Sequence, residues 1–116
     1  MDRAHELIIK EAQILAPRSV IDFGCGNGLL LKKFRKYNCR TFGVDSNPKN
    51  HPDSVGDIFD FRFRHDEQFD LALISQQRIE EEPAKWEFLL QRIRRQCMAL
   101  LVYDYRSNGL VLHRFQ

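Results

Sequence analysis

Residues 19–28 read Ser-Val-Ile-Asp-Phe-Gly-Cys-Gly-Asn-Gly, and this stretch decides the fold of the chain. The β-branched pair Val20 and Ile21 predicts a strand over 18–23, and the three glycines that follow predict a loop. The next residues, Leu-Leu-Leu-Lys-Lys-Phe, predict a helix over 28–37. A strand, a glycine loop and a helix in this order place a ligand-binding loop at the carboxyl end of a parallel strand.

The spacing of the glycines separates several kinds of nucleotide-binding loop. The dinucleotide fingerprint Gly-x-Gly-x-x-Gly needs a glycine at position 29, where the chain has Leu29, and no Gly-Lys-Ser/Thr phosphate loop follows. The pattern Asp22-x-Gly24-x-Gly26-x-Gly28 instead resembles the first motif of the class I S-adenosylmethionine-dependent methyltransferases. The alternative for this stretch alone is a tight strand-to-helix turn of another α/β protein.

A second acidic position supports a nucleoside ligand. Asp45 stands 21 positions after Gly24, at the end of a strand predicted over 40–45. A carboxylate at the tip of the second strand can accept hydrogen bonds from both hydroxyl groups of a ribose. The alternative is that residues 45–48 form only a turn and a helix cap. The resemblance to the methyltransferases continues here, because their second motif has an acidic residue at this place.

Two later stretches extend the resemblance. A short third strand is predicted over 55–58, and the resemblance implies that Asp57 binds the exocyclic amine of adenine while Ile58 lies on the ring. Residues 69–75, Phe-Asp-Leu-Ala-Leu-Ile-Ser, predict a buried central strand and resemble the fourth motif of the family. The tip that follows lacks the Asn/Asp-Pro-Pro-aromatic sequence of the branches that methylate amino groups of bases.

The resemblance implies S-adenosylmethionine as the cofactor and backbone contacts from the glycine loop to its methionine portion. Asp22 would orient the loop or accept from the amino group, and Ser75 would lie near the sulfonium. The residues expected to bind the cofactor are Asp22, Gly24, Cys25, Gly26, Gly28, Asp45, Ser46, Asp57, Ile58 and Ser75.

No catalytic residue is assigned from the sequence. Asp104, Tyr105, His51 and His113 are the candidate bases near the methyl group, and none has a defined partner in the sequence. The acidic run 80–82 has no histidine or carboxylate partner at a metal-ligand spacing, so no metal site is expected.

Strands that alternate with helices predict an α/β fold, a three-layer Rossmann-like methyltransferase core. We expect a mostly parallel sheet in the order 3-2-1-4-5, with an antiparallel edge strand at the C-terminal side, in a single domain over 1–116. The remaining expected elements are helices over 2–15 (capped by Asp2) and 84–96 and strands over 98–103 and 110–115, the last two joined by a turn at 107–109.

Two stretches admit more than one interpretation. Residues 59–68 alternate phenylalanine with polar residues, which is typical of a half-buried connection or short strand and, alternatively, of a surface that stacks nucleic-acid bases. Cys25 in the glycine loop is either a reactive thiol or a small residue that fits a crowded turn, and we expect the second.

The composition excludes some classes of protein. Eighteen basic and 16 acidic residues give a net charge of +2, which is no general signal for nucleic acid or membrane. No apolar run is long enough to span a bilayer, and the first residues are too polar for a signal peptide. Cys25, Cys39 and Cys97 have no metal-ligand spacing, which is typical of a reduced cytoplasmic protein without disulfides.

The sequence therefore predicts an S-adenosylmethionine-binding protein, a small methyltransferase whose acceptor is unknown. The expected site is shallow, because no substrate domain is inserted, and this suits a macromolecular acceptor or a partner protein that completes the pocket. One alternative is a catalytically reduced domain that binds the cofactor or a partner as a subunit. Another is a nucleotide-dependent oxidoreductase, which the early third glycine disfavours.

Overall fold

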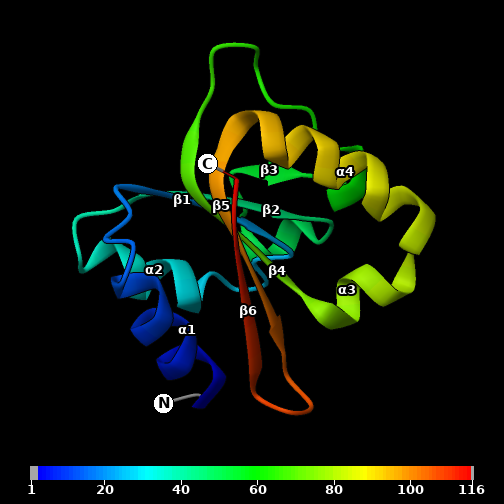
Figure 1. Ribbon diagram of the computed structural model, residues 1–116. Helices are drawn as coiled ribbons and strands as arrows, with labels where there is room; N and C mark the ends of the chain where they lie inside the picture. The colour runs from blue at the N-terminus through cyan, green and yellow to red at the C-terminus, as the bar shows by residue number, and fades with distance from the viewer. Residues whose placement is uncertain (1–2, 116) are drawn as a thin grey trace.

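Six strands form one sheet in the order β3-β2-β1-β4-β5-β6 in the computed structural model, which describes residues 3–115 (Figure 1). Strands β1 to β5 are parallel, and β6 pairs with β5 in the antiparallel direction. The predicted order and the antiparallel edge strand are confirmed. The elements are α1 (Arg3–Gln13), β1 (Ser19–Phe23), α2 (Leu29–Arg35), β2 (Arg40–Asp45), η1 (Pro48–Asn50), β3 (Ser54–Val55), η2 (Ile58–Asp60), β4 (Phe69–Ser75), α3 (Gln76–Glu81), α4 (Pro83–Gln96), β5 (Cys97–Asp104) and β6 (Gly109–Arg114).

Helices cover both faces of the sheet, as Figure 1 shows with α1 and α2 on one side and α4 on the other. Successive side chains of a strand point to opposite faces. In β4, Leu71 and Leu73 therefore pack with α1 and α2, whereas Ala72 and Ile74 pack with α4 and η2. Burial on both faces explains why the sequence of β4 is continuously apolar rather than alternating.

Two elements differ from the prediction. Strand β3 ends at Val55, so Asp57 lies beyond the strand, where it begins η2 instead. Helix α3 was not predicted, because Ile79 is the only aliphatic residue in it and it shows no apolar period. Its start is fixed by Ser75, whose Oγ accepts a hydrogen bond from the backbone N–H of Arg78 at 3.2 Å. The predicted cap Asp2 lies outside the described residues.

The alternating stretch after η2 is a half-buried connection. The rings of Phe61 and Phe63 pack edge-on against Phe23, with centroids 5.7 and 6.2 Å away. The intervening side chain of Arg62 is exposed. Because the phenylalanine rings face the core, this segment does not present a surface for stacking bases, and residues 61–68 form no strand.

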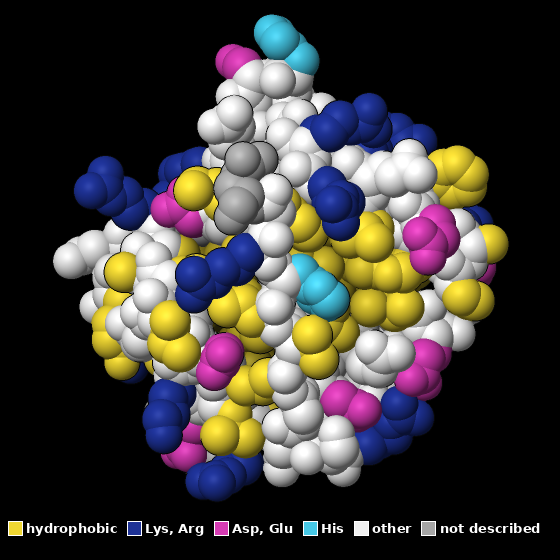
Figure 2. Space-filling model, viewed as in Figure 1, with side chains coloured by type: hydrophobic (Ala, Val, Ile, Leu, Met, Phe, Trp, Pro, Cys, Tyr) yellow, Lys and Arg dark blue, Asp and Glu magenta, His cyan; other side chains and the backbone are white. Residues whose placement is uncertain are grey.

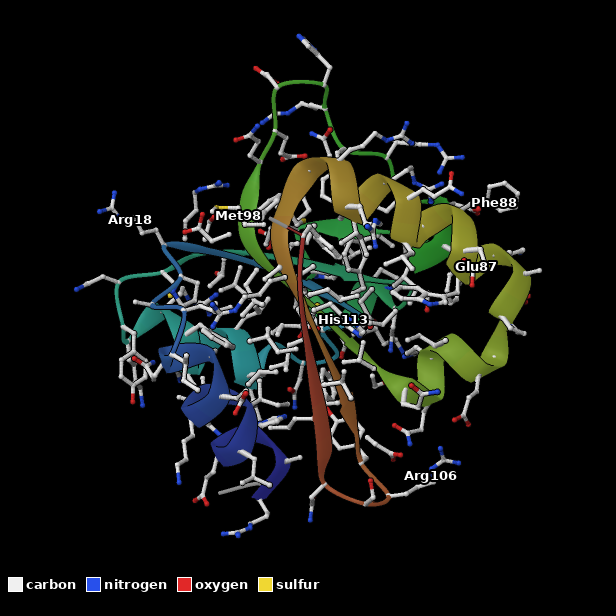
Figure 3. All side chains as sticks on the ribbon, viewed as in Figure 1. Arg18, Glu87, Phe88, Met98, Arg106 and His113 are labelled. Atoms are coloured by element: carbon white, nitrogen blue, oxygen red, sulfur yellow. The ribbon has the colours of Figure 1, made fainter. Side chains whose placement is uncertain are left out.

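The face beside β6 is only partly covered. A hollow of about 460 Å³ lies between α4 and β6, lined mostly by apolar side chains that include Trp86, Leu90 and Val111. Figure 2 shows the yellow side chains of this face together with a histidine, and Figure 3 labels that residue as His113, between β6 and α4. None of the described helices is both long and apolar enough to cross a membrane. All three cysteines are free.

Candidate functional site

The carboxyl ends of β1 and β2 place two acidic side chains side by side. Asp22 of β1 is 2% exposed, and its Oδ1 has no hydrogen-bond partner among the described residues. Burial, together with the negative charge of Asp45, raises the pKa of Asp22 to about 7, and the guanidinium of Arg78 opposes this shift. A buried carboxyl oxygen without a partner is rare in folded proteins, and it fits a site that receives a donor from a ligand.

The glycine loop runs from β1 across the tip of β2. The backbone N–H groups of Gly24 and Cys25 both donate to the carbonyl of Val44, at 2.8 and 3.1 Å. Gly26 has a φ of +56°, and no atom lies within 4 Å of the position that a Cβ would occupy there. This left-handed conformation favours glycine, and the empty space beside it leaves backbone open to a ligand.

Cys25 is a packing residue, which confirms the second of its two interpretations. A Cβ atom on Gly43 would lie 2.7 Å from its Sγ, so the thiol fills the space against β2. Burial, together with the nearby carboxylates of Asp22, Asp45 and Asp53, raises the pKa of Cys25 to about 12. The thiol is therefore protonated at neutral pH and is a poor nucleophile.

Asp45 holds the loop as well as facing the pocket. Its Oδ1 accepts from the backbone N–H of Gly26 at 3.2 Å, and its Oδ2 accepts from the backbone of Asn47 and the side chain of Asn50, both at 3.0 Å. Burial opposes ionisation, but these three donors outweigh it and lower the pKa of Asp45. The alternative prediction for residues 45–48, a turn and a helix cap, also holds, because the side chain of Asn47 caps η1.

Four of the predicted residues meet in one cavity of about 350 Å³. Asp45 and Ser46 reach it from the end of β2, and Asp57 and Ile58 reach it from the start of η2. Asp57 caps η2 by accepting from the backbone N–H of Phe59 at 2.9 Å, which fixes its carboxylate at the rim. The cavity is completed by Phe59, Arg78, Glu81 and Glu82.

The other predicted residues do not line this cavity. Gly26 is joined to Asp45, and Gly24 lies beneath the side chain of Arg78, whose Nε is 3.1 Å from the place of a Cβ at that glycine. Ser75 is buried, and its hydroxyl caps α3. Arg78 was not among the residues expected to bind the cofactor, because the polar helix that carries it shows no apolar period in the sequence.

The carboxyl ends of β4 and β5 carry a separate polar network. Asp104 accepts from the side-chain amide of Gln77 at 2.7 Å and from the backbone of Arg106 at 2.8 Å. Arg106 in turn donates to Glu80 of α3 at 2.8 Å. Figure 3 shows Arg106 at the end of the β5–β6 hairpin, below α3. This network ties the hairpin to the helix.

None of the candidate bases lies in the cavity. The hydrogen bond from Gln77, with further bonds from Arg106, lowers the pKa of Asp104 to about 2, which makes it a weak base. Tyr105 packs against Tyr103, with ring centroids 5.1 Å apart. His51 ends η1, and His113 lines the hollow beside β6. No group of three or more acidic, histidine or cysteine residues within the described chain is arranged to hold a metal.

Comparison with known proteins identifies the family. A family model described as a methyltransferase domain matches residues 2–105. No curated protein sequence matches the chain.

Solved structures of methyltransferases share the fold. The N-methyltransferase NodS from Bradyrhizobium japonicum WM9 superposes with a TM-score of 0.67 at 17% identity, over 86% of this chain and 65% of that one. The plantazolicin methyltransferase BpumL in complex with SAH gives 0.66 at 21% identity, over 87% of this chain and 45% of that one. Coclaurine N-methyltransferase bound to N-methylheliamine and SAH gives 0.65 at 26% identity, over 84% and 34%. This chain thus spans less than two thirds of the length of each of these three methyltransferases. Because the family model covers residues 2–105, the chain belongs to the methyltransferase domain family.

Proposed function

We propose that this domain binds S-adenosylmethionine in the cavity at the tips of β1 and β2 and takes part in transfer of the methyl group to an acceptor. The observation that carries the proposal is the convergence of Asp45, Ser46, Asp57 and Ile58, from two separate loops, in one cavity beside the glycine loop. The solved structures of BpumL and coclaurine N-methyltransferase contain SAH, the demethylated product, which supports the choice of ligand.

The residues present fit such a ligand. The unpartnered Oδ1 of Asp22 can accept a donor such as the amino group, and the open backbone at Gly26 can approach the methionine portion. Asp45 would hold the ribose hydroxyls through lone pairs that its three protein donors leave free. Asp57 would accept from the adenine amine, with Ile58 against the ring.

The bound cofactor would supply the reactive carbon, as a methyl group on a positively charged sulfur. The protein's part would be to hold the ligand and to place the acceptor in line with the methyl group. The acidic lining of the cavity suits a ligand that carries positive charge. The acceptor, a large molecule or one presented by a partner protein, would approach from the open side of the cavity.

Isothermal titration calorimetry with S-adenosylmethionine, S-adenosylhomocysteine and NAD tests the proposal. We expect the first two to bind and NAD not to bind. Asp45→Asn should weaken binding about 10-fold or more, because a hydrogen bond to a charged group contributes about 1.5–3 kcal/mol. Asn is preferred to Ala because the carboxylate also holds the loop, so removing it would disturb more than the ligand contact.

Asp66→Asn is the matched control, since it removes the same charge from an exposed position in the loop before β4. Its affinities should equal those of the unchanged protein. No binding of either adenosyl ligand at millimolar concentration would contradict the proposal. A second assay, with methyl-labelled S-adenosylmethionine and cell extract, tests transfer: labelled product would support an active enzyme, and binding without transfer would support the cofactor-binding subunit.

A further inference from the structure

Arg78 occupies a distinctive place in the candidate cofactor site. Its side chain crosses the glycine loop, with Nε 3.1 Å from the position of a Cβ at Gly24. Its backbone is anchored at the first turn of α3 by the hydroxyl of Ser75, at 3.2 Å. The guanidinium is therefore presented to the cavity from a fixed point on the helix.

The charges around the cavity are unequal. Four lining residues are acidic: Asp45, Asp57, Glu81 and Glu82. Among the described residues that line it, Arg78 is the only basic one. A ligand carboxylate would be repelled along most of this wall, and only the guanidinium offers it an opposite charge and paired N–H donors.

The present partner of Arg78 is replaceable. Its guanidinium meets Glu81 at 3.3 Å, and the two side chains are 44% and 54% exposed. Exposed ion pairs of this kind contribute little to stability, because water and salt screen them. Little stability would therefore be lost if Arg78 left Glu81 for a ligand carboxylate.

We propose that Arg78 binds the carboxylate of the amino-acid end of the adenosyl ligand and so makes the pocket select ligands that carry this end. The assignment rests on the proposed function, because it uses the same cavity. The amino-acid end is a zwitterion, and a group of opposite character lies on each side of Gly24. Arg78 lies over the loop and would face the carboxylate, and the unpartnered oxygen of Asp22 lies in the strand before the loop and would face the amino group. The nucleoside end would then lie toward Asp57 and Ile58.

Three ligands that differ only at the amino-acid end test this assignment by calorimetry. S-adenosylhomocysteine has the carboxylate and the amine, its decarboxylated analogue has the amine alone, and 5′-methylthioadenosine has neither. The unchanged protein should bind the first about 10-fold or more tightly than the second. Equal affinities for these two ligands would overturn the assignment without any variant.

Arg78→Gln supplies the second arm. It should weaken S-adenosylhomocysteine about 10-fold or more and should change the affinity of 5′-methylthioadenosine less than about 2-fold. Arg78→Lys keeps the charge but loses the planar fork, and it should give an intermediate loss. Arg106→Gln is the control, because that arginine contacts α3 through Glu80 outside the cavity, and its affinities should not change.

The calorimetric results that would contradict the two proposals are different. If the unchanged protein binds S-adenosylhomocysteine but Arg78→Gln weakens all three ligands equally, or none of them, the assignment of Arg78 is overturned and the adenosyl site stands. If the unchanged protein binds none of the three, the proposed function falls and the assignment falls with it.

Discussion

The tips of β1 and β2 and the tips of β4 and β5 lie on the same edge of the sheet, yet their polar groups are arranged in opposite ways. At the first pair, a buried carboxyl oxygen of Asp22 has no partner, and an acidic cavity is open beside it. At the second pair, Gln77, Asp104 and Arg106 satisfy one another and bind α3 to the hairpin.

This difference separates ligand-binding from structural polar groups. A ligand site keeps polar atoms that the protein itself does not satisfy, and their pKa values move away from the ordinary range at the expense of stability. Asp22, with its pKa raised to about 7, behaves in this way, whereas Asp104, with its pKa lowered to about 2, is stabilised by its neighbours. The tips of β1 and β2 thus keep polar groups suited to a ligand, whereas the polar groups at the tips of β4 and β5 form a structural network, the brace.

The pH dependence of stability should show the largest effect. Asp22 has a pKa of about 7 in the folded protein, against an ordinary value of 3.8. Between these two pH values, the folded protein therefore keeps a proton on Asp22 that the unfolded chain has lost. The free energy of unfolding should therefore fall as pH rises from about 4 to about 7, by up to about 4 kcal/mol. Asp22→Asn should remove most of this slope, as measured by urea unfolding at several pH values. An equal slope in the variant would show that Asp22 is not the titrating group.

Gly43→Val should produce the next largest effect. A Cβ at this position would lie 2.7 Å from Sγ of Cys25 and 3.1 Å from Cδ1 of Leu31. Because these neighbours belong to the glycine loop and to α2, the variant should lose about 2–3 kcal/mol of stability and should displace the loop. The urea midpoint measures the loss. A midpoint equal to that of the unchanged protein would mean that the loop does not pack on β2 in this way.

Gly26→Ala separates ligand binding from stability at the first pair of tips. Its φ of +56° strains any other residue, which should lower the free energy of unfolding by about 1–2 kcal/mol. No protein atom lies near the new methyl group, so the substitution should mainly obstruct the ligand. The affinity for S-adenosylhomocysteine should fall about 10-fold. Unchanged affinity would contradict the placement of the ligand on this loop.

Gln77→Ala tests the brace and should have the smallest effect. It removes the hydrogen bond of 2.7 Å to Asp104 and should lower the urea midpoint only slightly, because water can replace the lost donor. The affinity for S-adenosylhomocysteine should not change. A large loss of affinity with little loss of stability would place the ligand at the tips of β4 and β5 and would reverse the comparison.

Most of the fold could be predicted because the strands and the covering helices have clear periods. The continuous apolar run of β4 predicts a central strand, and the glycines after β1 predict a loop; the structure confirms both. The cavity residues Asp45, Asp57 and Ile58 were identified because they end or follow strands at positions that the family resemblance defines. Their meeting in one cavity is a finding of the structure.

Arg78 and helix α3 could not be predicted for a physical reason. Helix α3 is short and polar, and its start depends on one serine hydroxyl. Stability of this kind comes from the cap and from neighbouring elements, and it leaves no apolar period in the sequence. The hydrogen-bond network of Asp104 was hidden as well, because it joins residues 27 positions apart through side chains alone. The sequence therefore indicated Asp104 as a base without showing the partners that weaken it.

The most direct test of the central claim is an NMR titration of the isotope-labelled protein with S-adenosylhomocysteine. We expect the largest shifts of backbone amide signals at residues 24–28, 45–46 and 57–59, which surround the cavity between β2, η2 and α3. Signals of residues 104–109, in the brace at the hairpin, should change little. Shifts concentrated in the hairpin or in the hollow between α4 and β6, or no shifts at millimolar ligand, would contradict the account.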